Sequence, residues 1–276
     1  MRIKIIHILF ILSTVLIHSQ THRYIYELNY KPDASENNYK KQFMVLDINP
    51  DQVKYYDYKF LEKDSLNQVY RSQDRTWTTQ IPVTRKKNSE KNINYILVGD
   101  DIYSYTTNDH VEWNLEKEIK QENGLNLQKA TTHYGGREWV AWFTKDIPFN
   151  QGPYKFQGLP GLIVEIKDTK DNFKFKLVKN INLKSTYDTS NVLEVRYGDK
   201  PIPTDEKTVI KKAMEYFNNP LNDIKQEFSN NKISSFEYNG VKYKPEELAK
   251  LVKEEQEYIL QYYNPIELDK SFPYNK

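Results

Sequence analysis

Histidine and cysteine, the commonest ligands of catalytic metals, are sparse in this chain of 276 residues. Cysteine is absent, which excludes a thiolate zinc site, a cysteine nucleophile and a disulfide framework. After residue 20 the histidines are His22, His110 and His133, and none forms a His-Glu-x-x-His helix or a closely spaced pair. We therefore predict no metal site and no cofactor.

Carboxylates offer the remaining route to hydrolysis. No Gly-x-Ser-x-Gly motif occurs, so a serine nucleophile lacks its usual setting. A glycosidase needs only two carboxylates across a cleft, and Glu138 beside Trp139, with Glu165 or Asp146 as the second acid, supplies the residue types. A strand glutamate paired with a basic neighbour is the commoner outcome. The sequence thus favours a non-catalytic protein, and the alternative is a secreted carboxylate-dependent hydrolase acting on glycan or peptide.

β-strands must position these side chains, because short alternating runs dominate the first two-thirds of the chain. Residues 173–177, extended in phase to Leu183, alternate most clearly, and residues 162–166 are the predicted antiparallel partner. The link Asp168-x-x-Asp171-Asn172 offers oxygen ligands for calcium, but turn capping explains it more simply. Further strands rich in tyrosine and β-branched residues are predicted at 24–28, 43–46, 53–58, 93–98 and 102–105.

The pattern becomes helical near residue 204. Thr204-Asp205-Glu206 is a helix start, and an apolar stripe follows over residues 209–217. Asn218-Asn219-Pro220 should break this helix, and helical spacing resumes through Phe228. Tyr238-Asn239-Gly240-Val241 predicts a two-residue hairpin, and Pro245 opens a last helix before Pro265. We predict a β-dominated α+β fold, with an antiparallel, curved, half-barrel-like sheet followed by C-terminal helices.

The first 19 residues have the pattern of a secretory signal peptide. Arg2 and Lys4 precede an apolar run over residues 5–17, which is too short to span a bilayer and ends at small and polar residues. We expect cleavage after Ser19 or Gln20, which leaves one domain over residues 20–276. The whole chain carries 40 basic and 38 acidic residues, so cleavage leaves 38 of each. The expected product is exported, periplasmic or secreted, without a transmembrane anchor and, lacking cysteine, not a lipoprotein.

Glycine is concentrated in one segment. Of nine glycines, six lie between Gly124 and Gly161, together with three prolines and two tryptophans. Glycine permits positive φ or close backbone approach and proline fixes φ, so this segment has a specified backbone path. The run Gly158-Leu159-Pro160-Gly161-Leu162-Ile163 is interpreted first as a structural corner that leads into a strand. The alternative is a ligand or partner site lined by backbone.

Flanking residues carry a family resemblance. The run over residues 129–132, Gly136-Arg137, residues 141–144, Gly152-Pro153 and the motif at 158–163 resemble the GLPGLI family, exported proteins of unknown function found mainly in Bacteroidetes. Asn264-Pro265-Ile266-Glu267-Leu268 is similar to that family's usual ending. Because the family has no established activity, the resemblance implies export and a motif rather than a reaction. The motif and candidate binding residues are Arg137, Trp139, Trp142, Gly152, Pro153, Gly158, Leu159, Pro160, Gly161, Leu162 and Ile163.

These observations lead to one functional expectation. The chain is predicted to be an exported, non-catalytic binding or assembly protein of the cell envelope. Its expected partner is another envelope protein, or an apolar ligand held in the concave face of the sheet. Balanced charge gives no reason to expect nucleic acid.

Overall fold

A computed structural model describes residues 20–72, 78, 81–194, 200–238 and 240–274. The predicted signal peptide, residues 1–19, lies outside the described residues. The elements are, in chain order, β1 (Thr21–Tyr30), β2 (Lys40–Ile48), β3 (Gln52–Asp57), α1 (Lys59–Tyr70), β4 (Val83–Lys86), β5 (Lys91–Val98), β6 (Asp101–Asn108), β7 (Asn114–Glu122), β8 (Leu125–Tyr134), β9 (Arg137–Thr144), β10 (Leu162–Asp168), β11 (Phe173–Leu183), β12 (Ile202–Thr204), α2 (Glu206–Asn218), α3 (Asn222–Ser229), β13 (Phe236–Tyr238), β14 (Val241–Tyr243), the 3₁₀ turn Pro245–Glu247 and α4 (Leu248–Gln261).

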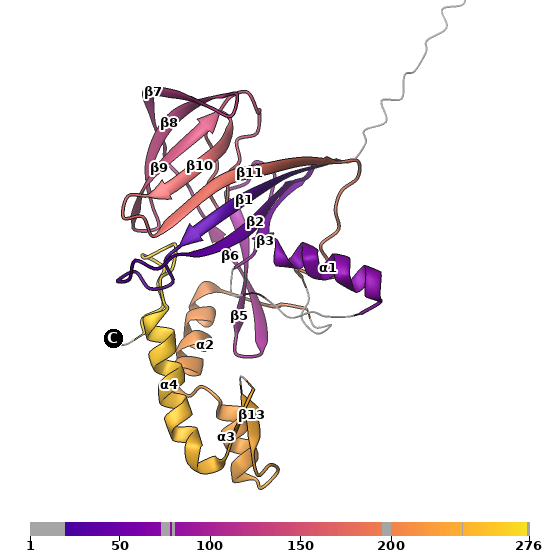
Figure 1. The fold of residues 1–276 in the computed structure, drawn as a ribbon, viewed down its shortest axis with the longest axis vertical. Helices are drawn as coiled ribbons and strands as arrows, with labels where there is room; N and C mark the ends of the chain where they lie inside the picture. The colour runs from indigo at the N-terminus through magenta and orange to yellow at the C-terminus, as the bar shows by residue number, and fades with distance from the viewer. Residues whose placement is uncertain (1–19, 73–77, 79–80, 195–199, 239, 275–276) are drawn as a thin grey trace, which may run out of the picture.

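Within the described residues, twelve strands form one open, strongly curved sheet in the order β12-β6-β5-β4-β3-β2-β1-β11-β10-β9-β8-β7 (Figure 1). Every pairing is antiparallel except that of β12 with β6. The predicted pairing of β10 with β11 is present. The β-dominated class with an antiparallel sheet and C-terminal helices is therefore confirmed, and the sheet does not close into a barrel.

The sheet buries its concave face against the chain's own loop. Residues 149–161, here called the plug, leave the end of β9, cross the concave side and return to β10. Phe156 is fully buried at its centre, 4.7 Å from Trp139 and 5.5 Å from Tyr134 between ring centroids. Side chains of β1, β2 and β3 complete this core. Tyrosine suits such a position because its ring packs while its hydroxyl finds a partner.

The convex face is buried in part as well. Val45 and Tyr56 point away from the plug and pack against Phe60 of α1 and Leu193. The helix projects from the sheet in Figure 1, and Phe60 is its one buried residue. Its sequence carries almost no amphipathic signal for that reason, so residue spacing alone predicts no helix there.

The C-terminal third folds as predicted. Asp205 caps α2 by accepting a hydrogen bond of 2.7 Å from the backbone N–H of Thr208. The chain then breaks and continues as α3, β13 pairs with β14, and Pro245 opens the turn into α4. In Figure 1 these elements lie below the sheet, and α2 and α4 pack side by side. No described helix is long and apolar enough to cross a membrane.

Candidate functional site

The Gly158–Ile163 motif closes the corner between the plug and β10. A Cβ placed on Gly161 would lie 2.0 Å from the carbonyl oxygen of Thr144, so only glycine fits. Gly158 has φ of +101°, a conformation open to glycine and rarely to other residues. Leu159, Leu162 and Ile163 are buried, and the hydroxyl of Tyr26 donates to the Ile163 carbonyl over 2.6 Å. The motif fixes the path by which the plug enters the core.

The other predicted site residues are distributed over this corner and the neighbouring strands. Trp139 is buried and its indole donates to the Tyr134 carbonyl over 2.9 Å. Trp142 lies half-buried under Lys120, whose nitrogen is 4.5 Å from the ring centroid. Gly152 and Pro153 are buried in the plug, while Pro160 is exposed. The eleven predicted residues therefore do not surround one ligand cavity.

Arg137 has a clear role, which is to hold the C-terminal end of the chain. Residues 264–270, here called the strap, pass over the plug after α4. The guanidinium of Arg137 donates to Asn264 Oδ1 (2.7 Å) and to the carbonyls of Pro265 (2.8 Å) and Ile266 (3.0 Å). It also pairs with buried Asp168 over 3.3 Å. Burial lowers the pKa of Arg137, and the Asp168 carboxylate opposes that shift.

A buried ionic cluster joins the strap to the plug. Lys155 of the plug lies 2.6 Å from Glu267 and 3.3 Å from Asp109, and Lys270 lies 2.6 Å from Asp109 and 2.9 Å from Glu267. The hydroxyl of Tyr154 donates to Glu267 over 2.5 Å. Lys155, Glu267 and Asp109 are each less than a tenth exposed, so this pairing occurs largely away from water.

The carboxylates of this cluster stay ionised. Burial alone would raise the pKa of Asp109, but Lys155, Lys270 and a hydrogen bond from Thr107 lower it to about 2. Burial also opposes ionisation of Glu267, and the same two lysines hold the pKa of Glu267 below its usual value. The cluster is therefore two cations matched to two anions.

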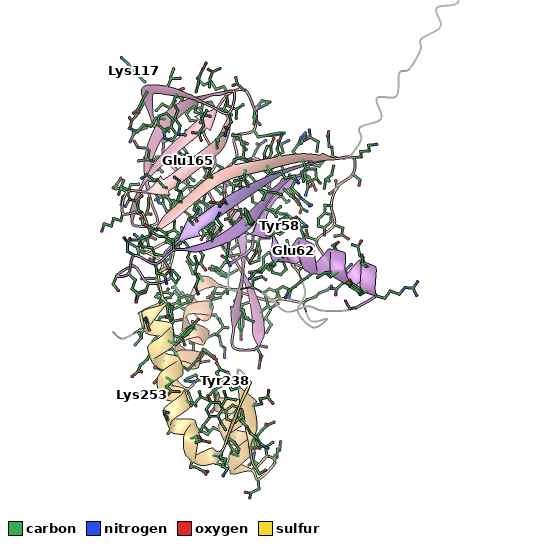
Figure 2. All side chains as sticks on the ribbon, viewed as in Figure 1. Tyr58, Glu62, Lys117, Glu165, Tyr238 and Lys253 are labelled. Atoms are coloured by element: carbon green, nitrogen blue, oxygen red, sulfur yellow. The ribbon has the colours of Figure 1, made fainter. Side chains whose placement is uncertain are left out.

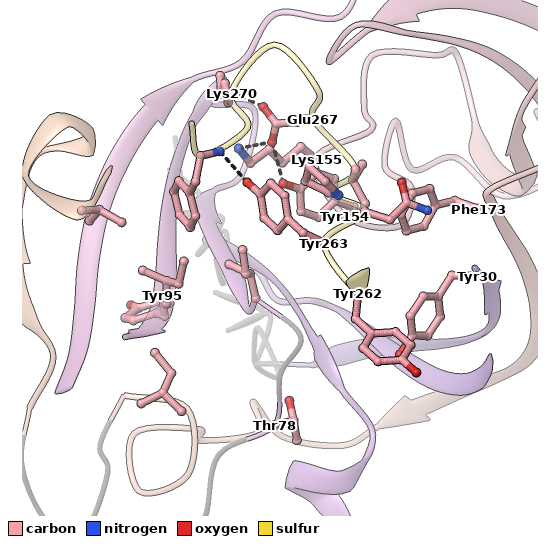
Figure 3. A pocket seen from close by; sticks show the side chains of 18 of the residues that line it. Tyr30, Thr78, Tyr95, Tyr154, Lys155, Phe173, Tyr262, Tyr263, Glu267 and Lys270 are labelled. Carbon is pink, nitrogen blue, oxygen red and sulfur yellow. Dashed lines mark hydrogen bonds and ion pairs between the residues drawn. The ribbon is translucent and has the colours of Figure 1, made fainter. Parts of the chain in front are cut away.

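A cleft of about 460 Å³ lies beside this cluster, between the end of the concave side and helices α2 and α4. Its size is in the range of small-molecule sites, which also tend to be mostly apolar with a few polar groups. Figure 3 shows Tyr154, Lys155, Glu267 and Lys270 gathered at one end, with Tyr95 on one side and Tyr30 and Tyr262 on the other. Most lining residues are aromatic or aliphatic: Tyr30, Pro32, Tyr55, Ile81, Tyr95, Ile96, Leu97, Tyr105, Tyr154, Phe173, Val209, Ile210, Tyr258, Tyr262, Tyr263, Pro265, Ile266 and Phe272.

The acids weighed for hydrolysis lie elsewhere. Glu138 is exposed and hydrogen-bonded to His133 over 2.7 Å. Glu165 lies on the upper strands in Figure 2, between Lys174 (3.3 Å) and Lys120 (3.6 Å). Asp146 accepts from the backbone N–H of Asn126 over 3.2 Å. None of these acids lines the cleft, where the carboxylates of the described lining are Glu206 and Glu267.

The candidate metal ligands are engaged in other contacts. His22 and His110 contact Asn182 and Glu90, respectively. Asp168 accepts from the backbone N–H of Phe173 over 2.7 Å and pairs with Arg137, which accounts for the acidic turn without calcium. Among the described residues, no three histidine or acidic side chains form a metal-binding group.

Sequence reasoning did not assign the cleft residues to a site. Lys155 lies inside the glycine-rich segment and Glu267 inside the run at 264–268, two regions that the sequence marks by their backbone path and family resemblance. Their meeting joins residues 112 positions apart, which no local pattern reveals. Tyr55 was predicted as a strand residue only.

Comparison with known proteins supports the fold and leaves the activity open. A family model described as "Protein of unknown function (Porph_ging)" matches residues 73–165, which include the plug and the whole motif. No curated protein matches the chain. Two solved structures of PNGF-II, in space groups C2 and P21, are similar in fold, with TM-scores of 0.53 and 0.52 and 14% and 15% sequence identity. Each match covers 71% of this chain and 33% of PNGF-II, so the chain spans about a third of that protein's length.

Proposed function

We propose that this chain is an exported, non-catalytic binding protein of the cell envelope that holds a mainly apolar ligand in the cleft. The observation that carries the proposal is the cleft itself, a cavity of about 460 Å³ walled by tyrosines and aliphatic side chains. Sites for small ligands combine such walls with a few placed polar groups. Here Lys155 and Lys270 pair with Glu267 at one end of the cleft, and the hydroxyl of Tyr55 is a further polar group of the lining.

The carboxylate of Glu267, at the base of the cleft, is engaged in contacts within the protein. Glu267 accepts from Tyr154 and Lys155 and pairs with Lys270. Its lowered pKa keeps it from acting as a proton donor near neutral pH. The pairing of Glu138 and Glu165 with basic side chains likewise gives the hydrolase alternative no support.

Export and family membership complete the proposal. The pattern over residues 1–19 supports a cleaved signal peptide. The resemblance of the motif at 158–163 and of the ending at 264–268 to the GLPGLI family supports the proposal that the chain belongs to that family. N-terminal sequencing of the protein from an envelope fraction should start at Gln20 or Thr21. A product that keeps Met1 would contradict export by this route.

The cleft can be tested with a neutral fluorescent probe. Residues 20–276 should bind N-phenyl-1-naphthylamine with a saturable rise in fluorescence. Replacing half-buried Ile210, which lines the cleft on α2, by tryptophan should fill the space and weaken binding at least tenfold. Val178→Trp, on an exposed position of β11 outside the cleft, is the matched control. Equal binding by Ile210→Trp and the wild-type protein would contradict the site.

A further inference from the structure

The charged groups around the cleft cancel one another. Lys155 and Lys270 each contact both Asp109 and Glu267, at 2.6 to 3.3 Å. The remaining charges of the described lining are Lys40 and Glu206, one of each sign. An anionic ligand would therefore meet no unmatched cation and would lie against the Glu267 carboxylate. A cationic ligand would meet the lysines in the same way.

Two buried hydroxyls of the described lining, those of Tyr55 and Thr78, have no hydrogen-bond partner among the described residues, and Tyr55 is the more deeply buried residue of the two. Tyr55 is 2% exposed, and its hydroxyl forms no hydrogen bond with any described residue. Burial, together with the nearby charge of Asp57, raises the pKa of this phenol well above its ordinary value, so it stays a neutral hydrogen-bond donor. A buried hydroxyl without a partner is costly, and a ligand oxygen placed beside it removes that cost.

The walls above this hydroxyl are apolar over most of their extent. Ile96 and Leu97 of β5 and Val209 and Ile210 of α2 form an aliphatic side. Across the cleft, Tyr258 of α4 and Tyr262, the residue that follows the helix, lie with ring centroids 4.7 Å apart and remain 56% and 39% exposed. Exposed rings beside a cavity lose water-accessible apolar surface when a ligand enters, which favours binding.

We infer that the ligand of this cleft is an uncharged amphiphile, with an apolar body along the aliphatic and aromatic walls and one neutral oxygen-bearing head at Tyr55. This inference rests on the proposed function, that the cleft binds a ligand. A free oligosaccharide fits less well, because it requires several unengaged polar partners for each ring. The lysines and acids at the base are already engaged with one another.

The test compares neutral and anionic amphiphiles of the same chain length. Displacement of bound N-phenyl-1-naphthylamine at pH 8 is measured for 1-monolauroylglycerol, for laurate and for maltotriose, with both amphiphiles below their micelle concentrations. We expect the glyceride to displace the probe at least ten times more tightly than laurate, and maltotriose to have no effect. Laurate binding as tightly as the glyceride, or displacement by maltotriose alone, would overturn the inference.

A second variant separates head recognition from folding. Tyr55→Phe removes only the unpartnered hydroxyl, so we expect unchanged or slightly higher thermal stability and unchanged binding of the probe, which carries no oxygen. Glyceride affinity should fall about three- to tenfold, the value of one neutral hydrogen bond. An unaltered glyceride affinity would place the head elsewhere and overturn the assignment. If the wild-type protein does not bind the probe, the proposed function fails; if the probe binds but the lipid order is reversed, only this inference fails.

Discussion

Replacing Lys155 by methionine should destabilise the protein more than any comparable change at an exposed lysine. Methionine fills a similar volume, so the loss is mainly that of the buried ammonium, which lies 2.6 Å from Glu267 and 3.3 Å from Asp109. The two carboxylates would then share Lys270 alone. Removing one partner of a buried ion pair costs about 3–5 kcal/mol, because the remaining charge stays buried without compensation.

The expected loss is measurable by thermal and urea unfolding at pH 7. For a chain of this size, about 3–5 kcal/mol corresponds to a fall in melting temperature of roughly 6–20 °C. The matched control is Lys167→Met, since the Lys167–Asp171 pair is exposed and 2.9 Å apart. Surface pairs contribute about 0–1 kcal/mol, so this control should shift the melting temperature by only a few degrees.

A double variant decides whether charge is the cause. Lys155→Met combined with Glu267→Gln removes one cation and one anion, and the remaining Lys270 and Asp109 still match at 2.6 Å. Its loss should therefore be smaller than the sum of the two single losses, with a coupling of about 1–3 kcal/mol. A Lys155→Met loss below about 1 kcal/mol, or strictly additive losses, would refute the reasoning, because the lysine would then contribute only packing.

Three further changes test the rest of the fold. Gly161→Ala should cost about 4 kcal/mol or more and leave little soluble protein, because the added Cβ would clash with the backbone of Thr144. The control Gly124→Ala, where φ is +77° and no described atom beyond the chain neighbours lies within 4 Å of the added Cβ, should cost only about 1 kcal/mol. Similar unfolding midpoints for the two variants would contradict the role of Gly161 in the corner. The pKa of Asp109 is depressed from 3.8 to about 2, so its ionised form contributes roughly 2 kcal/mol of stability that is fully present above pH 4 and lost as pH falls toward 2. In Asp109→Asn, the free energy of unfolding should therefore depend less steeply on pH over that range. An unchanged pH dependence would contradict this contribution. Lysine at position 137 cannot reproduce the four contacts that Arg137 makes with the strap and Asp168. In Arg137→Lys, limited proteolysis after residue 264 should therefore be faster than in the wild-type protein, while the sheet core stays intact. An unaltered cleavage rate would show that another contact holds the strap.

Local sequence patterns predict most of the secondary structure. The alternation of residues 173–183 predicted β11 and its pairing with β10, because side-chain period is a property of the strand itself. Asp205 and Pro245 marked helix starts through their own hydrogen-bonding and backbone constraints. Helix α1 was not predicted because a single buried residue, Phe60, leaves no periodic pattern to detect.

The glycine-rich segment shows how far a motif can be interpreted without coordinates. Its residues indicated a specified backbone path, and the close approach of Gly161 to Thr144 supplies the physical cause. The sequence did not indicate that the segment fills the concave side of the sheet. Phe156 became a core residue through contacts with strands β8 and β9, which a linear pattern does not contain.

Residue types and their local spacing are enough to predict the strand-rich class, the helical C-terminal third, the absence of thiol chemistry and the candidate signal peptide. The positions of the buried charges depend on the three-dimensional fold. Lys155 and Glu267 are 112 positions apart and meet because the plug turns inward and the strap passes over it. The cleft beside them is built from β1, β3, β5, α2 and α4 together. Contacts between distant segments follow from how the sheet curves and what packs against it, which local sequence does not encode.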